Sequence, residues 1–432
     1  MFRHLVLLCL WSVAVTTQAD DLLSIYQQAL RSDPSLKAAQ LQRELSDAQQ
    51  GQAGSALLPQ VNANVNFSHN DRHIESQGTD TYNGERYSVS LTQAVFDLPK
   101  TYNWRRYQAL TEKSDADFQQ AQQVLIYEVV ERYFTVLATQ DGLGLIAQET
   151  HSTEQQLQQI QRQYEKNIVK ITDVYELEAK LDGLVAQGIE IETNLDIAKQ
   201  SLIELTGEPF TNLAILLNNI QFVELEGNAQ GAAEQAQQDN LLIKAQEKEI
   251  LAADYNLTSQ HAKHLPVVDI QLQYYNTDNG FQNSQTPVID TKVASINVTI
   301  PLFSGGGTYF GAQEAAKQLA MSKQRKVSLR RSIEKETRDA FLSANASVRR
   351  IRAADKALKT SIKAREAMEQ GFKYGMQSIG DVLISQAREY SANRDLLEAK
   401  YTYIRNRIRF QHVSGTLDYE SLEEVNQWLI GH

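Results

Sequence analysis

A short stretch near the N-terminus alternates strictly between apolar and polar residues. From Val61 to Ser68 every second residue is apolar, and the residues between are Asn or Ser. Strand side chains point alternately to two faces, so this stretch predicts a β-strand with one apolar and one polar face. Asn is a poor strand former, and an apolar face opposite a neutral polar face is typical of a membrane barrel. A half-exposed strand of a soluble hairpin would show the same alternation.

The pattern occurs a second time, 207 residues further along. Leu58 and Leu265 begin matching stretches, and each is followed by another alternating strand, around Val89 and around Ile296. Four such strands in two copies favour a membrane barrel over a single soluble hairpin. The face predicted to contact lipid contains Val61, Val65, Phe67, Val89, Leu91, Ile270, Leu272, Ile296 and Val298. The face predicted to contact water contains Asn66, Ser90, Gln273 and Asn297.

One polar stretch separates the two strands of each pair. In the first copy we expect strands at Val61–His69 and Glu85–Val95, joined by a polar loop over Asn70–Gly84. In the second copy the corresponding loop is expected over Asn276–Asp290.

Helical periodicity fills most of the remaining chain. Apolar residues recur at helical spacing from Leu22 to about Ala56, interrupted at Asp33-Pro34 because proline removes a helical donor. A second helix is predicted from Pro99 to about Tyr164, and roughly 65 residues at 1.5 Å each extend on the order of 100 Å. Such a length indicates a coiled coil or stacked helices.

A returning helix completes the first copy. Its apolar residues alternate gaps of three and four, which is a heptad seam that requires a partner helix; they are Val174, Leu177, Leu181, Leu184, Gly188, Ile191, Leu195, Ala198, Leu202 and Leu205. The helix is predicted to stop at Gly207, before Pro209.

The second copy repeats the order of elements. We expect a helix over Ala232–His264, two strands, a long helix to about Phe372 and a returning helix to Val413. The sequence thus predicts a mainly α protein with a small β part, built by tandem duplication. The predicted divisions are a signal peptide at 1–19, a first repeat at 20–227 and a second repeat at 228–432.

The first residues read as a secretory signal. Met1–Ala19 has a basic start, an apolar run and small residues before Asp20, so export is predicted. Cys9, the only cysteine, lies inside the apolar run; a lipidated cysteine is the less favoured alternative, and no disulfide framework is expected. No later run of about 20 apolar residues could cross a bilayer as a helix, so membrane entry would require a barrel.

Charge and side-chain chemistry narrow the possible functions. The net charge of −11 disfavours nucleic-acid binding, which needs clustered Lys and Arg. His261 and His264 are three apart on a helix, but no third metal ligand lies nearby. Ser304–Gly307 lacks the Lys-Ser/Thr of a phosphate loop, and no catalytic triad can be assembled. We expect no enzyme activity, cofactor or metal.

Several motifs resemble the TolC family of outer-membrane efflux proteins over nearly the whole mature chain. They are Tyr26–Ala29, Leu57–Gln60, Leu91–Asp97, Ile171–Val174, Ala367–Glu369 with Gly371, and Asp381–Leu383. The resemblance implies a homotrimer whose protomers each give four antiparallel strands to a twelve-stranded barrel in the outer membrane. Long helices would form a periplasmic tunnel, with Phe210–Gln230 and Thr416–His432 in an equatorial belt. The implied partners are a periplasmic adaptor and an inner-membrane transporter, and the implied cargo is drugs or, in type I secretion, proteins.

The two helix turns, Asn167–Thr172 and Gly375–Gly380, are predicted to meet and form a periplasmic gate. The returning helices begin with Asp173 and Asp381, and threefold symmetry would make Asp381 a ring of carboxylates that attracts cations. Alternatively, both aspartates only cap their helices.

The gate departs from the family pattern. Ile384 occupies the position of a second acidic residue on the last helix, and Gln377 and Phe372 replace the Arg and Tyr that hold Asp173. The resemblance therefore implies a more loosely held gate, for which Lys170 could partly compensate. A rival reading, a secreted coiled-coil structural or adhesion protein, would predict a soluble product instead of a membrane channel.

Overall fold

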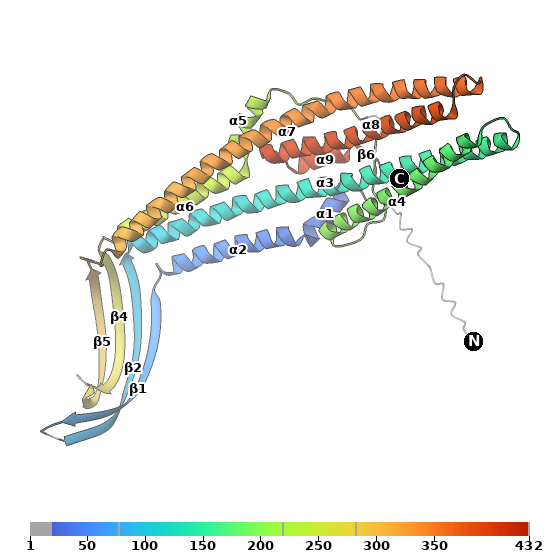
Figure 1. Ribbon diagram of the computed structural model, residues 1–432. Helices are drawn as coiled ribbons and strands as arrows, with labels where there is room; N and C mark the ends of the chain where they lie inside the picture. Colours follow the sequence, from blue (N-terminus) through green and yellow to red (C-terminus); the bar gives the residue numbers. More distant parts are fainter. Residues whose placement is uncertain (1–19, 77, 218–219, 281–282, 431–432) are drawn as a thin grey trace, which may run out of the picture. The chain divides into compact units, whose positions relative to one another are not determined.

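The computed structural model describes residues 20–76, 78–217, 220–280 and 283–430. The predicted signal peptide, 1–19, lies outside this part. The first repeat contains α1 (Leu22–Ser32), α2 (Pro34–Ser55), β1 (Gln60–Ile74), β2 (Gly78–Phe96), α3 (Leu98–Glu165) and α4 (Ile171–Thr206). The second contains α5 (Ala229–Asp239), α6 (Leu241–Ala262), β4 (Val267–Asn279), β5 (Gln285–Thr299), α7 (Gly307–Lys373) and α8 (Ile379–Ser414), as Figure 1 shows. The linkers add β3 (Ile215–Leu216), α9 (Tyr419–Asn426) and β6 (Leu429–Ile430).

The chain forms two compact units, and each unit draws on both repeats. The strand unit comprises Ser35–Ala121 and Gln237–Glu334, and the turn unit comprises Met1–Pro34, Gln122–Ala236 and Lys335–His432. The long helices α3 and α7 each contribute to both units. In the described part of the chain, no helix is both long and apolar enough to cross a membrane.

The strand unit contains an antiparallel sheet with the order β1-β2-β4-β5. Its two hairpins confirm the predicted strands, but the predicted loops Asn70–Gly84 and Asn276–Asp290 are wrong, because most of their residues continue the strands. The pairing persists because cross-strand polar contacts replace apolar ones. His69 Nδ1 lies 2.8 Å from Asn83 Oδ1, and Arg72 lies opposite Asp80.

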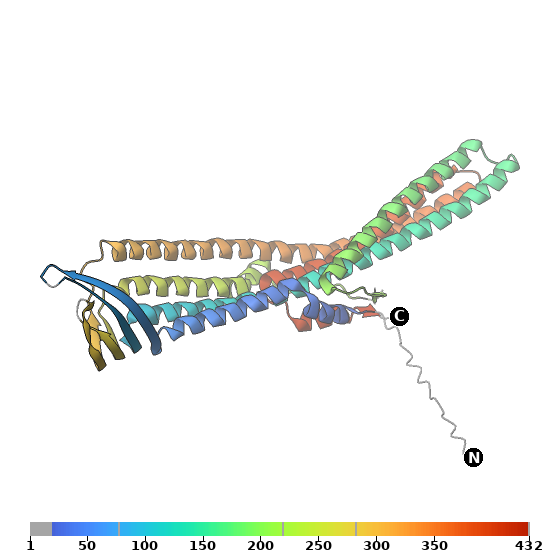
Figure 2. The same cartoon turned by 90° about the horizontal axis from the view of Figure 1, so that it is seen from below.

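Four helical segments lie side by side in the strand unit, in the order α2, α3, α6 and α7 (Figures 1 and 2). Arg43 of α2 pairs with Asp115 of α3 at 2.6 Å. Next along, Lys248 of α6 pairs with Glu112 of α3, and Lys326 of α7 pairs with Glu247 of α6 at 2.7 Å. This order repeats the order of the strands to which the helices are joined.

The predicted single helix over Ala232–His264 is wrong, because the chain breaks at Asn240. The Asn240 side chain accepts a hydrogen bond from the Leu242 N–H at 2.9 Å and caps α6. Asn240 is 207 positions after Asp33, so both repeats break at the same place. The first copy uses proline for the break and the second uses an amide cap, a weaker sequence signal.

The turn unit buries the predicted heptad seam of α4. Leu177 and Leu202 are fully buried, and α4 ends where predicted, with Gly207 in the left-handed conformation at φ 72°. Tyr133 of α3, also fully buried, donates to the carbonyl of Ala214 at 3.0 Å and lies 3.2 Å from that of Asp20. A central helix is thereby tied to the linker that carries β3.

Loss of the Tyr133 hydroxyl should destabilise the turn unit. Tyr133→Phe leaves a buried carbonyl without its donor, which costs about 1–3 kcal/mol. The expected result is a lower thermal unfolding temperature in detergent. Tyr175→Phe is the control, because the Tyr175 side chain is 60% exposed. Equal unfolding temperatures for the two variants would contradict this role of Tyr133.

Candidate functional site

The predicted apolar face of the sheet is continuous across all four strands. Val61 lies opposite Leu91, Leu91 lies opposite Leu272, and Ile270 lies opposite Ile296. Residues directly opposite one another share a face, so these side chains form one surface. The face is open to the surroundings: Val61 is 64% exposed and Ile296 is 71% exposed. Val65, Phe67, Val89 and Val298 belong to the same exposed face.

The opposite face is polar over most of its area, with Val293 and Ile289 of β5 as apolar exceptions. Asn62 lies opposite Ser90, and Ser90 lies opposite Gln273. On the next pair, Asn297 donates to the carboxylate of Asp269 at 2.9 Å. The register therefore gathers the predicted water-facing residues on one side, as a channel lining requires.

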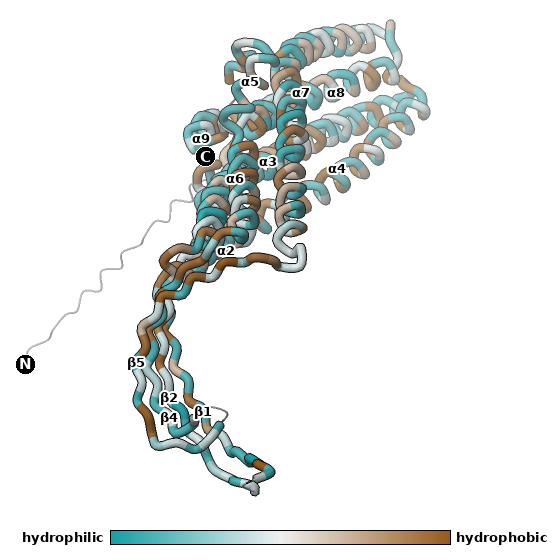
Figure 3. The backbone as a smooth tube through the Cα atoms, turned by 90° about the vertical axis from the view of Figure 1, so that its left-hand side faces the viewer, coloured by the Kyte–Doolittle hydropathy of each residue, from teal (hydrophilic) through white to brown (hydrophobic). Residues whose placement is uncertain are grey.

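Aromatic residues end the apolar face on the hairpin side. Phe67 and Tyr87 make an edge-on contact with ring centroids 6.0 Å apart. Tyr274 lies opposite Val89 on the apolar face, and its hydroxyl donates to the charged Asp290 at 2.7 Å. Such rings are typical of a membrane–water boundary. Figure 3 shows apolar colouring near the helices and mostly polar colouring toward the β1–β2 tip.

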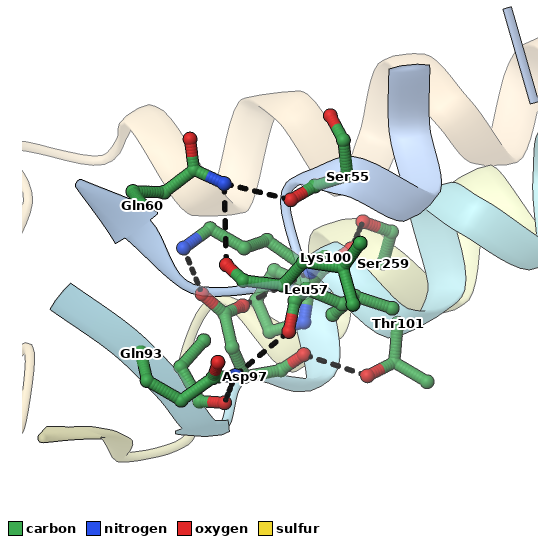
Figure 4. Close-up of polar contacts among 11 residues, drawn as sticks. Ser55, Leu57, Gln60, Gln93, Asp97, Lys100, Thr101 and Ser259 are labelled. Carbon is green, nitrogen blue, oxygen red and sulfur yellow. Dashed lines mark hydrogen bonds and ion pairs between the residues drawn. The ribbon is translucent and has the colours of Figure 1, made fainter. Parts of the chain in front are cut away.

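A polar network fixes the junction between strands and helices (Figure 4). The Gln93 side-chain amide donates to the carbonyl of Leu57 at 2.8 Å and so joins β2 to the segment entering β1. Asp97 caps α3 by accepting from the Lys100 N–H at 3.0 Å, and Ser259 of α6 donates to the Pro99 carbonyl at 2.9 Å. These bonds satisfy backbone groups where the chain changes from strand to helix.

The two predicted helix turns have the same backbone geometry in both repeats. The Ile168 N–H donates to the Gln163 carbonyl at 2.9 Å, and 208 positions later the Met376 N–H donates to the Gly371 carbonyl at 2.9 Å. Asn167 and Gly375 occupy the left-handed position, with φ of 57° and 70°. Asn and Gly are the residues that tolerate this conformation best.

The two turns meet in one apolar cluster, as predicted. Its buried members come from both hairpins and are Ile160, Val174, Leu177, Ile379 and Val382. Phe372 and Met368 pack against them. Beside the cluster lies a cavity of about 580 Å³, bordered by Gln156, Glu369 and Lys373.

Both candidate gate aspartates cap their own helices. Asp173 accepts from the Lys170 N–H at 3.2 Å. Asp381 accepts from the Ser378 hydroxyl at 2.8 Å and from the Ser378 N–H at 3.1 Å. The bonds from Ser378 lower the pKa of Asp381, so its carboxylate remains charged at neutral pH. The exposed Asp381 side chain combines a capping role with a fixed negative charge.

Gln377 and Phe372 stand where the family has the Arg and Tyr that hold Asp173. Among the described residues, no hydrogen bond joins Asp173 to Gln377, which instead lies over Gly371. A β-carbon on Gly371 would approach Gln377 Cγ to 2.7 Å, so any other residue there would force the Gln377 side chain to move. Ile384 is 53% exposed, and Lys170 contributes its backbone N–H to Asp173.

A charged cluster between α7 and α8 was not predicted from the sequence. Arg365 bonds to Glu389 and to Glu369, the latter at 2.8 Å, and Gln386 donates to Glu369 at 3.2 Å. These contacts join α7 to α8, the two helices that form the helical hairpin of the second repeat. The Arg365–Glu369 spacing of four was a usable signal, whereas the contact with α8 depended on the helix register.

Comparison with known proteins identifies the architecture. The family model described as "Outer membrane efflux protein" matches residues 25–208 and 232–416. The chain belongs to this family. It is 29% identical to Outer membrane protein TolC of Vibrio cholerae over 417 residues, covering 95% of this chain and 94% of the relative. It is 26% identical to Proteases secretion protein PrtF of Dickeya chrysanthemi, covering 96% and 92%.

A solved structure shows the same fold. The CmeC outer membrane channel of Campylobacter jejuni has a TM-score of 0.81 and 16% identity, with 95% of this chain and 90% of that chain covered. Outer membrane efflux proteins are trimeric channels that work with periplasmic adaptor proteins and inner-membrane pumps. The protein is therefore an outer-membrane channel for efflux or type I secretion. The rival reading as a structural or adhesion protein is set aside.

The two faces of the sheet should respond differently to charge. A charged residue at the bilayer midplane on the lipid face costs roughly 2–4 kcal/mol, while a polar lumen tolerates it. We expect Val89→Arg to reduce heat-resistant trimer in outer-membrane fractions and Ser90→Arg to leave it near the parent level. The neighbouring positions provide a matched pair on one strand. Equal assembly of both variants would mean that the facing is wrong.

Proposed function

We propose that the protein is a passive export duct whose periplasmic entrance is gated by its two helix turns. The apolar cluster that joins both turns carries this proposal, because opening the duct by separating the hairpins would expose its buried side chains. In this proposal the cluster keeps the two turns together. In the family pattern an Arg and a Tyr do this by binding the aspartate, and here Gln377 and Phe372 occupy their positions. The gate is then held by burial of apolar surface, which salt screens far less than an ion pair.

Symmetry would give the gate a charged ring. In a trimer, Asp381 recurs three times, and its bonds from Ser378 favour the ionised carboxylate. Three exposed carboxylates around a narrow axis attract cations and disfavour anions. The cap and the ring are compatible, because the same side chain can accept bonds from Ser378 and face the axis.

The proposed duct performs no chemistry of its own and needs no cofactor. We propose that residues 1–19 direct export and that 20–227 and 228–432 are the two repeats of each protomer. Two relatives bear the names Proteases secretion protein and Alkaline protease secretion protein, so protein cargo is proposed alongside small molecules.

Weakening the apolar cluster should open the gate. Ile379, which is 4% exposed, lies in the cluster, and its replacement by Ala removes buried contacts worth about 2–5 kcal/mol. Ile379→Ala should therefore raise single-channel conductance in planar bilayers. Met376→Ala in the same turn, where the side chain is 71% exposed, should not. Unchanged conductance in a correctly folded Ile379→Ala trimer would argue against gating at this cluster.

Removing the charge of Asp381 should change ion selectivity without unfolding the turn. Asp381→Asn keeps a capping side chain but loses the carboxylate. We expect a reversal potential closer to zero in a salt gradient. In the parent protein, cation preference should fade as the pH falls, because protonation removes the Asp381 charge. The bonds from Ser378 lower the pKa of Asp381, and the like charges of the proposed ring oppose this effect. A parent-like reversal potential in Asp381→Asn would place Asp381 away from the conducting path.

A further inference from the structure

The polar face of the sheet carries few charged residues. In the described strands this face consists of the even-numbered residues of β1, those of β2 up to the bulge after Ala94, and the odd-numbered residues of β4 and β5. Its charged residues are Arg72, Asp80, Arg86 and Asp269. Where a channel wall is otherwise neutral, each charge has a strong influence on the ions that pass.

Three of these four charged residues have a polar partner on the same face. Arg72 lies opposite Asp80, so their charges offset one another. Asp269 accepts a hydrogen bond from Asn297 at 2.9 Å. Arg86 differs, because no carboxylate in the described part of the chain forms an ion pair with it. Its positive charge is therefore not neutralised within the protomer.

Arg86 lies beside the aromatic ring of Tyr275 on the polar face. The guanidinium carbon is 5.2 Å from the centre of that ring, which is a cation–π contact. The residues directly opposite Arg86 are neutral, Asn66 on β1 and Thr277 on β4. A guanidinium that stacks on a ring keeps the N–H donors at its edge free for an anionic oxygen.

Arg86 lies near the end of the sheet that is remote from the helices. It adjoins Tyr87, one of the aromatic residues that end the apolar face. Asp269, at the other end, lies opposite Ala94, which is eight residues from Arg86 along β2 (94 − 86 = 8). At about 3.4 Å per residue the two levels are about 27 Å apart. The polar face therefore has a negative charge near the helices and a positive charge near its outer end.

The end of β4 covers the polar face just beyond Arg86. Asn279 Nδ2 donates to Ser68 Oγ at 3.4 Å, and a β-carbon on Gly84 would overlap the Asn279 side chain. Tyr82, on the same face, is only 6% exposed. Arg86 itself remains exposed. It is therefore accessible to solutes at a level where the wall next to it is already covered.

We propose that Arg86, supported by Tyr275, forms an anion-binding site on the channel wall near the outer mouth. In the trimer the site occurs three times around the lumen. It binds the carboxylate, sulfonate or phosphate groups of passing solutes, because guanidinium N–H donors bind such oxygens strongly. The proposal depends on the polar face lining the lumen, and it is independent of the gate proposed at the helix turns.

Block of the channel by a polyanion tests this site. The protein is added to one chamber of a planar bilayer, where its helical part remains, and tripolyphosphate is added to the other chamber. The probe then reaches Arg86 without passing the helix turns, and it should reversibly reduce the current of the parent channel. Arg86→Gln should raise the half-blocking concentration about tenfold or more, because a charged hydrogen-bond donor is lost. Absence of block in the parent channel would overturn the proposal.

Lys292→Gln is the matched control. Lys292 lies opposite Tyr274, so it is a cation at a nearby level on the opposite face of the sheet. Its removal lowers the charge of the barrel by the same amount but leaves the proposed site intact. The half-blocking concentration should therefore stay at the parent value. Equal weakening of the block by Lys292→Gln and Arg86→Gln would show a general effect of net charge and would contradict a site at Arg86.

A second variant keeps Arg86 in place. Asn66→Asp puts a carboxylate directly opposite Arg86 and leaves the contact with Tyr275 available. It should raise the half-blocking concentration as Arg86→Gln does, and it decides the question if Arg86→Gln fails to form heat-resistant trimer. If assembled Asn66→Asp channels are blocked as readily as the parent, Arg86 only packs against Tyr275 and binds no anion.

Discussion

Unpaired backbone groups on the outer sides of β1 and β5 are the constraint on which the rest of the architecture depends. In the described sheet, these two strands have one neighbour each. Within a bilayer every unpaired N–H or C=O costs several kcal/mol, so a four-stranded strip is stable there only when its edges pair with other copies. The same constraint affects the helices. Helix α2 leads into β1 and α7 follows β5, so these two helices lie at the same two borders.

The pattern of apolar and polar residues predicted those strands and helices in which one whole face has the same surroundings along its length. Alternation from Val61 to Ser68 identified a strand with one apolar and one polar face, and the α4 seam identified a buried helix face. The pattern did not predict strand residues at places where the surroundings of the face change along the strand. Beyond Phe67 the apolar face ends, yet pairing continues through polar contacts such as Arg72 opposite Asp80, so strand was mistaken for loop.

Other features could not be predicted because periodicity reveals an apolar face but not its partner. The row containing Leu41 and Leu45 reads as a buried helix face, and it is exposed in the single chain. Likewise the spacing of Arg365 and Glu369 suggests a local pair, while the contact between Arg365 and Glu389 depends on how α8 returns beside α7. Both cases require the tertiary register, which sequence spacing within one helix does not contain.

The two repeats share the backbone geometry of their helix turns, while the side chains that support this geometry differ between them. The turns share their backbone bonds, yet Ser378 adds a hydroxyl donor to Asp381 where Lys170 offers Asp173 only its N–H. Lys248 of α6 pairs with Glu112, whereas the equivalent position of α2 is the exposed Leu41. The ring in the proposed gate uses Asp381, the one of the two equivalent aspartates that also accepts a hydroxyl bond from its own cap residue.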